Sequence, residues 1–298
     1  MVEQLELKNL SFYKGVVLNR TDADYLLDDD GVDWGSVPSH ISSYSSIDGL
    51  GSVISNVSIS NPRPIRIVGW ITQGEDSTIE DKKEYLSKIC NPIDPIRITC
   101  GAYTIEGRMS SSIKFATTMN ENNEEMCKFS LYIECPKPFF TKHIERRLGA
   151  STSEPILIDE AASSETVIKS LPITLENYGD FDVGAEFLIE LSDTYQDLYV
   201  VSQDPKSLLP SFFGLEGTLR EGTLFRVITE TNRKYVSHYD LWNLNSEWVK
   251  VYKAFDSLSN QCQLTLELGV SSSTRAANFE GVALTIKYDI LYLSMEDM

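Results

Sequence analysis

The sequence predicts a mainly β protein with two domains, an α+β domain over residues 1–148 and an all-β domain over residues 149–298. Three observations lead to this prediction. Short stretches of alternating apolar and polar residues recur along the chain, one segment near residue 80 has helix signals, and the composition changes near residue 150. A chain of 298 residues is also long enough to form two ordinary hydrophobic cores.

The first domain begins with short strand-like runs at residues 5–7 and 16–18. A longer strand is predicted at 62–72, where Ile65, Ile67 and Ile71 share one face. Residues 22–34 are rich in aspartate. An EF-hand calcium loop needs a glycine at its sixth place and a glutamate at its twelfth, and this segment fails that test, so we interpret it as a solvated turn. Residues 39–60 are rich in Ser, Gly and Ile, which indicates a loop with weak strand content.

Residues 74–90 have the signals of a single helix. Ser77 followed by Glu80 fits a capping box, and Lys88 suits the negative end of the helix dipole. Its apolar stripe consists of Ile79, Leu86, Ile89 and Cys90. An Asn-Pro pair ends the helix, and a strand is predicted at residues 95–100.

The clearest strand covers residues 127–135, where apolar residues alternate with polar ones. The apolar set is Cys127, Phe129, Leu131, Ile133 and Cys135. Pro136 and Pro138 lack the backbone donor that a sheet requires, so the strand must end there. Residues 110–119 are its predicted antiparallel partner, because a short polar connection suits a hairpin.

The second domain contains predicted strands only. They cover residues 171–176, 186–191, 224–228, 234–237, 248–255, 262–268 and 282–293. Seven or more short strands separated by turn residues predict a β-sandwich or jelly roll. Residues 141–166, first basic and then rich in Ser and Thr, form the predicted linker between the domains.

Three short stretches resemble one family in the same order along the chain. The strand at 127–135 runs into Glu-Cys-Pro-Lys-Pro-Phe-Phe, and residues 63–69 read Arg-x-Ile-x-Ile-x-Gly. Segments of the second domain complete the likeness: 177–180, 219–224, 266–270 and 284–288. Together they resemble the distal tail (Dit) proteins of long-tailed, non-contractile phages. Residues 229–231 depart from the pattern, because the Asp-Thr pair often found there is missing.

The resemblance implies a tail-tube-like first domain that forms a hexameric ring, and a galectin-like second domain. The ring would join the tail tube protein to a tail-associated hub protein and to receptor-binding or baseplate proteins, and it would leave a channel for DNA. The expected location is the virion tail tip, after assembly in the host cytoplasm. Residues 39–60 would reach across to a neighbouring subunit. A relative from a contractile tail stays open as an alternative.

The formal charge of the chain is −18, from 26 basic and 44 acidic side chains. Residues 1–150 have 16 basic and 21 acidic side chains, net −5, and residues 151–298 have 10 and 23, net −13. Such a surface repels nucleic acid and anionic lipid, so we expect neither sequence-specific DNA binding nor membrane insertion. An acidic wall would let DNA slide through a channel, but acidity also serves solubility.

The sequence predicts no enzyme, metal site or cofactor. The three histidines are far apart, and no P-loop, Gly-x-Ser-x-Gly or Gly-x-Gly-x-x-Gly motif occurs. The five cysteines show no Cys-x-x-Cys spacing and are interpreted as reduced structural thiols; they are Cys90, Cys100, Cys127, Cys135 and Cys262. An acidic N-terminus and the lack of a run of about 20 apolar residues predict a soluble protein.

A carbohydrate-binding module is the alternative function. Trp242, Trp248 and Tyr252 lie close together in the sequence of the second domain and could stack on the sugars of a host cell wall. Aromatic residues are also common in strands, where they pack into the core, and this reading is favoured.

Overall fold

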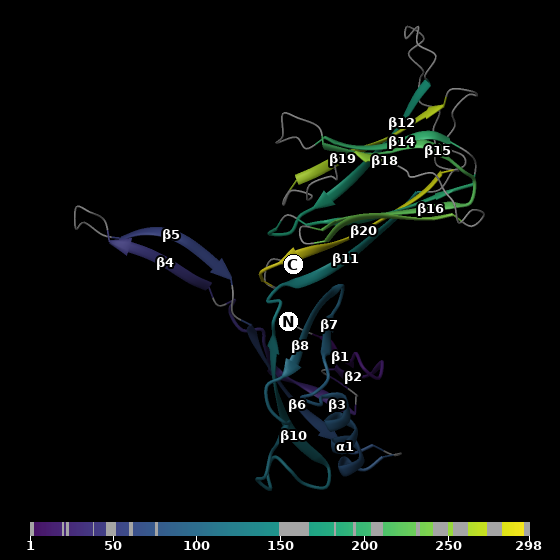
Figure 1. The fold of residues 1–298 in the computed structure, drawn as a ribbon. Coiled ribbons are helices and arrows are strands. Elements are labelled where there is room, and N and C mark those ends of the chain that lie inside the picture. Colours follow the sequence, from purple (N-terminus) through teal and green to yellow (C-terminus); the bar gives the residue numbers. More distant parts are fainter. Residues whose placement is uncertain are drawn as a thin grey trace. The chain divides into compact units, whose positions relative to one another are not determined.

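The computed structural model describes residues 3–19, 21, 24–37, 39–45, 52–59, 62–74, 77–148, 167–181, 183–192, 195–203, 211–230, 233–240, 250–252, 262–272 and 282–294. Within these ranges the protein has twenty strands and one helix, which confirms the mainly β prediction (Figure 1). The chain divides into two compact units, one of residues 1–142 and 293–298 and one of residues 143–292.

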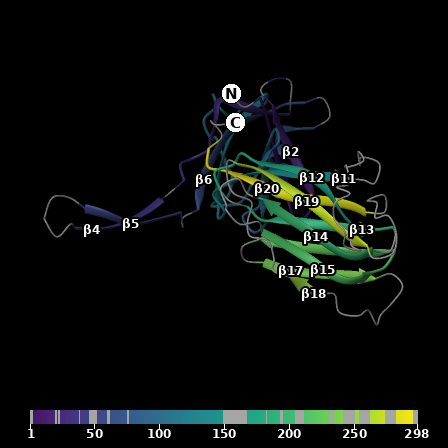
Figure 2. The same cartoon turned by 90° about the horizontal axis from the view of Figure 1, so that it is seen from above.

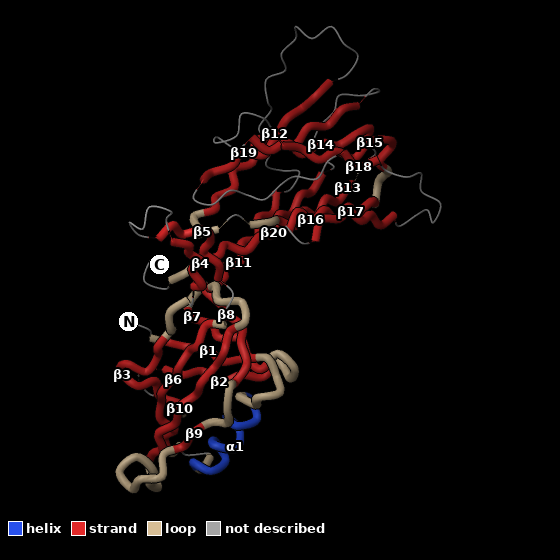
Figure 3. The backbone as a smooth tube through the Cα atoms, turned by 60° about the vertical axis from the view of Figure 1, so that its left-hand side comes forward, coloured by secondary structure: helices blue, strands red, loops and turns tan. Residues whose placement is uncertain are grey.

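The first unit contains helix α1 and strands β1 to β10, and strand β11 begins in it (Figure 3). The elements are β1 (Gln4–Asn9), β2 (Lys14–Asn19), β3 (Tyr25–Asp33), β4 (Ser39–Ser45), β5 (Ser52–Ile59), β6 (Arg63–Thr72), α1 (Ile79–Ile89), β7 (Ile96–Cys100), β8 (Tyr103–Met109), β9 (Lys114–Phe115), β10 (Met126–Cys135) and β11 (Phe140–Leu148).

Seven strands of the first unit close into a barrel in the order β8-β7-β1-β2-β3-β6-β10. The ring of strands closes because β10 also pairs with β8, through Ile133 opposite Met109 and Glu134 opposite Arg108. The pairing of β2 with β3 is the shortest, a single parallel pair. Closure leaves the barrel strands without a long free edge, and the inward side chains fill the interior.

Strand β10 has the predicted faces, because all five residues of its apolar set are at most 1% exposed. It ends at Cys135, directly before the first proline. Its predicted antiparallel pairing with residues 110–119 is confirmed over a short stretch only. The long partner is β6, paired from Arg63 to Thr72, whereas residues 110–119 contribute only the two-residue strand β9. Strand β10 therefore pairs with β6 along one edge, and with β9 and β8 along the other.

Helix α1 begins one residue later than the sequence suggests. The capping box consists of Thr78 and Asp81, not Ser77 and Glu80. Both pairs have the spacing of a capping box, so the spacing alone does not show at which of the two residues the helix begins. The predicted stripe is buried, and the helix contacts β1, β2 and β6 of the barrel. Lys82 is also buried on this face, where its Nζ donates to Thr72 O and Asp24 Oδ1, both at 2.6 Å.

The segment interpreted as a turn forms a strand, and the segment interpreted as a loop with weak strand content forms two strands. The aspartate-rich segment contains β3, because Tyr25 and Leu27 are buried and the strand pairs with β6. The Ser- and Gly-rich segment contains β4 and β5, which pair with each other (Figure 1). Among the described strands, this hairpin is a separate two-stranded sheet.

The second unit contains two sheets, drawn as two layers in Figure 1. One has the order β17-β16-β13-β20-β11, and the other β12-β19-β14-β15-β18 (Figure 2). The elements are β12 (Val167–Asn177), β13 (Ala185–Leu191), β14 (Tyr195–Gln203), β15 (Ser211–Leu219), β16 (Thr223–Glu230), β17 (Arg233–Asp240), β18 (Lys250–Tyr252), β19 (Cys262–Ser272) and β20 (Val282–Tyr292).

The second unit differs from the sequence analysis in two places. Strands β14 and β15 were not predicted, and residues 140–148 form β11 where a linker was expected. The rest of that expected linker, residues 149–166, lies outside the described residues. The finer assignment of this unit as a galectin-like jelly roll stays a prediction.

Candidate functional site

The three candidate sugar-stacking residues are not brought together by the described part of the structure. Trp242 and Trp248 lie outside the described residues. Tyr252 is the last residue of the short edge strand β18, where its backbone lies opposite Gly214 of β15. Sugar stacking therefore stays a prediction.

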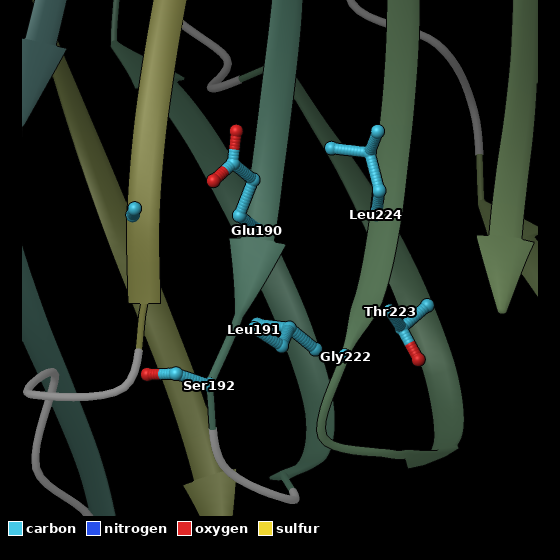
Figure 4. Close-up of a pocket in the computed structure, with 7 residues that line it drawn as sticks. Glu190, Leu191, Ser192, Gly222, Thr223 and Leu224 are labelled. Carbon is cyan, nitrogen blue, oxygen red and sulfur yellow. The ribbon is translucent and has the colours of Figure 1, made fainter. Parts of the chain in front are cut away.

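A pocket of about 440 Å³ opens at the end of strands β13, β16 and β20 in the second unit. Sequence reasoning missed it, because its residues carry no motif. They are Glu190, Leu191, Ser192, Gly222, Thr223, Leu224 and Ala283 (Figure 4). Glu190 lies between Leu224 and Ala283, its partners on the two neighbouring strands. The turn beside it is held by a 2.8 Å bond from Gly222 N to Leu191 O.

The pocket offers little chemistry. Of its described lining residues, Glu190 alone is titratable, and the hydroxyls of Ser192 and Thr223 supply the other polar side-chain groups. Glycoside hydrolysis requires two carboxyl groups at a set separation, and this lining supplies one. Leu191, Leu224 and Ala283 make the rest of the side-chain lining apolar.

The outer face of the barrel carries cations that lie over aromatic rings. Lys114 Nζ is 4.9 Å and the Arg66 guanidinium 5.9 Å from the ring centre of Tyr132 on β10. Lys128 Nζ lies 4.9 Å from the ring centre of Trp70 and 3.2 Å from Asp28 Oδ2. These contacts stack long side chains flat on β6 and β10 and stabilise that face.

The Glu-Cys-Pro-Lys-Pro-Phe-Phe stretch, which ends at Phe140, has a structural role in the first unit. Phe140 is buried, with the guanidinium of Arg63 4.7 Å from its ring centre and Trp34 in edge contact at 5.2 Å. Arg63 is only 3% exposed, and its Nη2 donates to the carbonyl of Leu293. Burial lowers the pKa of Arg63. The motif thus anchors the strand exit beside the returning C-terminal segment.

Among the described residues, no group of three or more His, Cys, Asp or Glu side chains is placed to hold a metal ion. Cys90, Cys100, Cys127 and Cys135 are free thiols. Burial raises the pKa of Cys90 and of Cys135 to about 12, so both thiols stay protonated at neutral pH. His143 Nδ1 lies 2.8 Å from Asp289 Oδ1 in an exposed pair on β11 and β20.

None of the described helices is long and apolar enough to span a membrane.

Comparison with known proteins identifies the fold. No protein-family model and no curated protein match the sequence. The crystal structure of the Dit protein of SPP1, described as a paradigm of the hub adsorption apparatus in phages infecting Gram-positive bacteria, matches with a TM-score of 0.54. The identity is 13%, over 97% of this chain and 99% of that chain. The chain therefore has the fold of a phage Dit protein.

A chain of the phage P2 baseplate in its activated conformation with Ca matches at a TM-score of 0.45 and 9% identity. The match covers 93% of this chain and 99% of that chain.

Proposed function

We propose that this chain is a structural protein of a phage tail tip, located in the virion and not an enzyme. The observation that carries the proposal is the similarity of fold to the SPP1 Dit protein over 97% of the chain, so that both units take part in the match. The absence of any catalytic motif from the sequence agrees with a structural role.

The first unit is proposed to have a tail-tube-like fold and to form a hexameric ring around a channel for DNA. A protein that builds a ring needs rigid subunits, and a closed barrel with a helix packed on it is rigid. The acidic surface supports the channel, because a net charge of −18 offers a passing polyanion few places to bind. Cyclic symmetry also closes a limited set of contacts without open-ended aggregation.

The second unit is proposed to be a galectin-like sandwich that carries receptor-binding or baseplate proteins. The ring would stack on the tail tube protein on one side and on a tail-associated hub protein on the other. These contacts should be large, because a virion must not dissociate on dilution.

The test is the mass of the purified protein by light scattering, followed by electron microscopy of the same fraction. A closed ring of about six chains with a central hole is expected. A protein that stays monomeric at high concentration, and that does not bind to isolated tail tubes, would contradict the proposal.

A further inference from the structure

Two loops of the first unit are tied together by side-chain and backbone hydrogen bonds. One is the β1–β2 turn, residues 10–13, and the other is the loop between α1 and β7, residues 90–95. Ser11 Oγ donates to Asp94 Oδ1 at 2.8 Å, and Leu10 N donates to Pro95 O at 3.0 Å. We call these two loops the two-loop platform.

A buried asparagine fixes the platform from below. Asn9 is 0% exposed, and its Nδ2 donates to Ile89 O, the last carbonyl of α1, at 3.0 Å. Its Oδ1 accepts from the backbone N–H groups of Ser11 and Phe12, at 2.9 and 3.2 Å. One side chain therefore fixes the turn to the helix end, and the platform keeps its shape without a partner.

This fixed frame presents large apolar side chains to water. Phe12 is 60% exposed, Tyr13 78% and Ile93 75%. Tyr13 has φ of 56°, and of the described residues it is the one non-glycine with a positive φ. The loop of Ile93 is held as well, since Arg108 Nη1 donates to the Ile93 carbonyl at 2.6 Å. A strained backbone that holds apolar groups in solvent is typical of a binding surface.

The rim of the platform is basic although the chain is acidic. Residues 8–15 contain Lys8 and Lys14 and no carboxylate, while the Asp and Arg within residues 91–97 cancel. Arg108 adds one positive charge and Glu106, the ion-pair partner of Arg97, removes one, so the local formal charge is +2, against −18 for the whole chain. In the described part of the protein, no carboxylate forms an ion pair with Lys8, Lys14 or Arg108.

We propose that the two-loop platform is the contact by which one copy of this chain docks onto an acidic surface of a second copy. Charge complementarity supports a second copy as the partner, because the basic and apolar two-loop platform complements the acidic surface of the chain itself. Two platforms facing each other would bring like charges together, so the contact joins two different surfaces. Such a heterologous contact can close into a ring. The inference rests on the proposed self-assembly and adds the surface responsible for it.

The test is a photo-crosslink from the platform of the full-length protein. Phe12 is replaced by benzoylphenylalanine, and ¹⁵N-labelled and unlabelled copies are mixed before illumination. Crosslinked peptides that combine both labels are expected, with the second peptide from an acidic segment. Crosslinks confined to single copies at high protein concentration would overturn the proposal.

A matched pair of variants measures the energetic role of the platform. Phe12→Ser combined with Ile93→Ser should weaken self-association about 10-fold or more, and Lys14→Glu should weaken it most at low salt. Met119→Ser is the control, because Met119 is 89% exposed and outside the platform. An equal effect of the control and the platform variants would overturn the proposal.

The two hypotheses fail in different ways. Mixed-label crosslinks in a protein whose mass is that of a dimer would support the platform contact and contradict the ring. Rings that persist in the platform variants, without mixed-label crosslinks, would support the ring and overturn the platform contact.

Discussion

Replacing Asn9 by alanine should destabilise the first unit by about 3 kcal/mol. The side chain makes three well-formed hydrogen bonds, one to Ile89 O and two from the backbone of Ser11 and Phe12. A fourth contact, to Asp94 Oδ2 at 3.4 Å, is too long to add much. A hydrogen bond contributes on the order of 1 kcal/mol net, and three such bonds are lost at a site with 0% exposure.

Asn123→Ala is a matched control, because Asn123 makes the same local bonds at the surface. Its Oδ1 accepts from Glu125 N and Met126 N, both at 2.9 Å. Asn123 is exposed, so water can replace the lost acceptor, and the expected cost is below about 1 kcal/mol.

The assay is urea unfolding with hydrogen exchange as the readout. Exchange is measured on peptides from β1 and β7, so that the free energy obtained is that of the first unit. The free energy of unfolding should fall by about 3 kcal/mol in Asn9→Ala and by clearly less in Asn123→Ala. Equal losses in the two variants would refute the reasoning, because burial would then make no difference to the value of these bonds.

Three further changes have defined outcomes. Thr78→Ala removes the capping box of α1 and should cost about 1 kcal/mol, seen as faster exchange in the first turn of the helix; unchanged exchange would contradict the cap. Phe129→Ala opens a cavity in the barrel and should lower the free energy of unfolding in urea by about 4 kcal/mol. A decrease below about 1 kcal/mol would show that the barrel interior is not closely packed. Iodoacetamide at pH 8 should label Cys100 in the folded protein but not Cys90 or Cys135, and the masses of the peptides measure this labelling. Labelling of all three cysteines at one rate would contradict the burial of Cys90 and Cys135.

Local sequence patterns predicted the elements better than their partners. The alternation around Phe129 identified the buried face of β10, and Pro136 marked its end, because both depend only on neighbouring residues. The pattern could not name β6 as the partner, since Ile67 and Leu131 meet across 64 residues of sequence. Periodicity shows which face is buried, but it does not show which strand lies beside it.

Composition misled where the tertiary context was stronger. The run of aspartates at residues 28–30 suggested a turn. These residues lie at a register shift within β3, between Leu27 and Val32, and the flanking Tyr25 and Leu27 are buried. Exposed carboxylates cost little on the solvent side of a strand, so the apolar residues decide its conformation. The platform was also missed, because no sequence rule separates Asn9 from an ordinary turn asparagine.

The sequence by itself determined the β-rich class, the helix α1 and the alternating faces of β6 and β10, because these follow from the spacing of apolar residues and from the positions of proline. It also contained the short motifs by which the chain resembles Dit proteins. The tertiary structure alone decided that β10 closes a barrel with β8, that Arg63 lies over Phe140, and that Asn9 fixes two loops into one surface. Those features join residues far apart in the chain, and their contacts arise only once the strands have packed together.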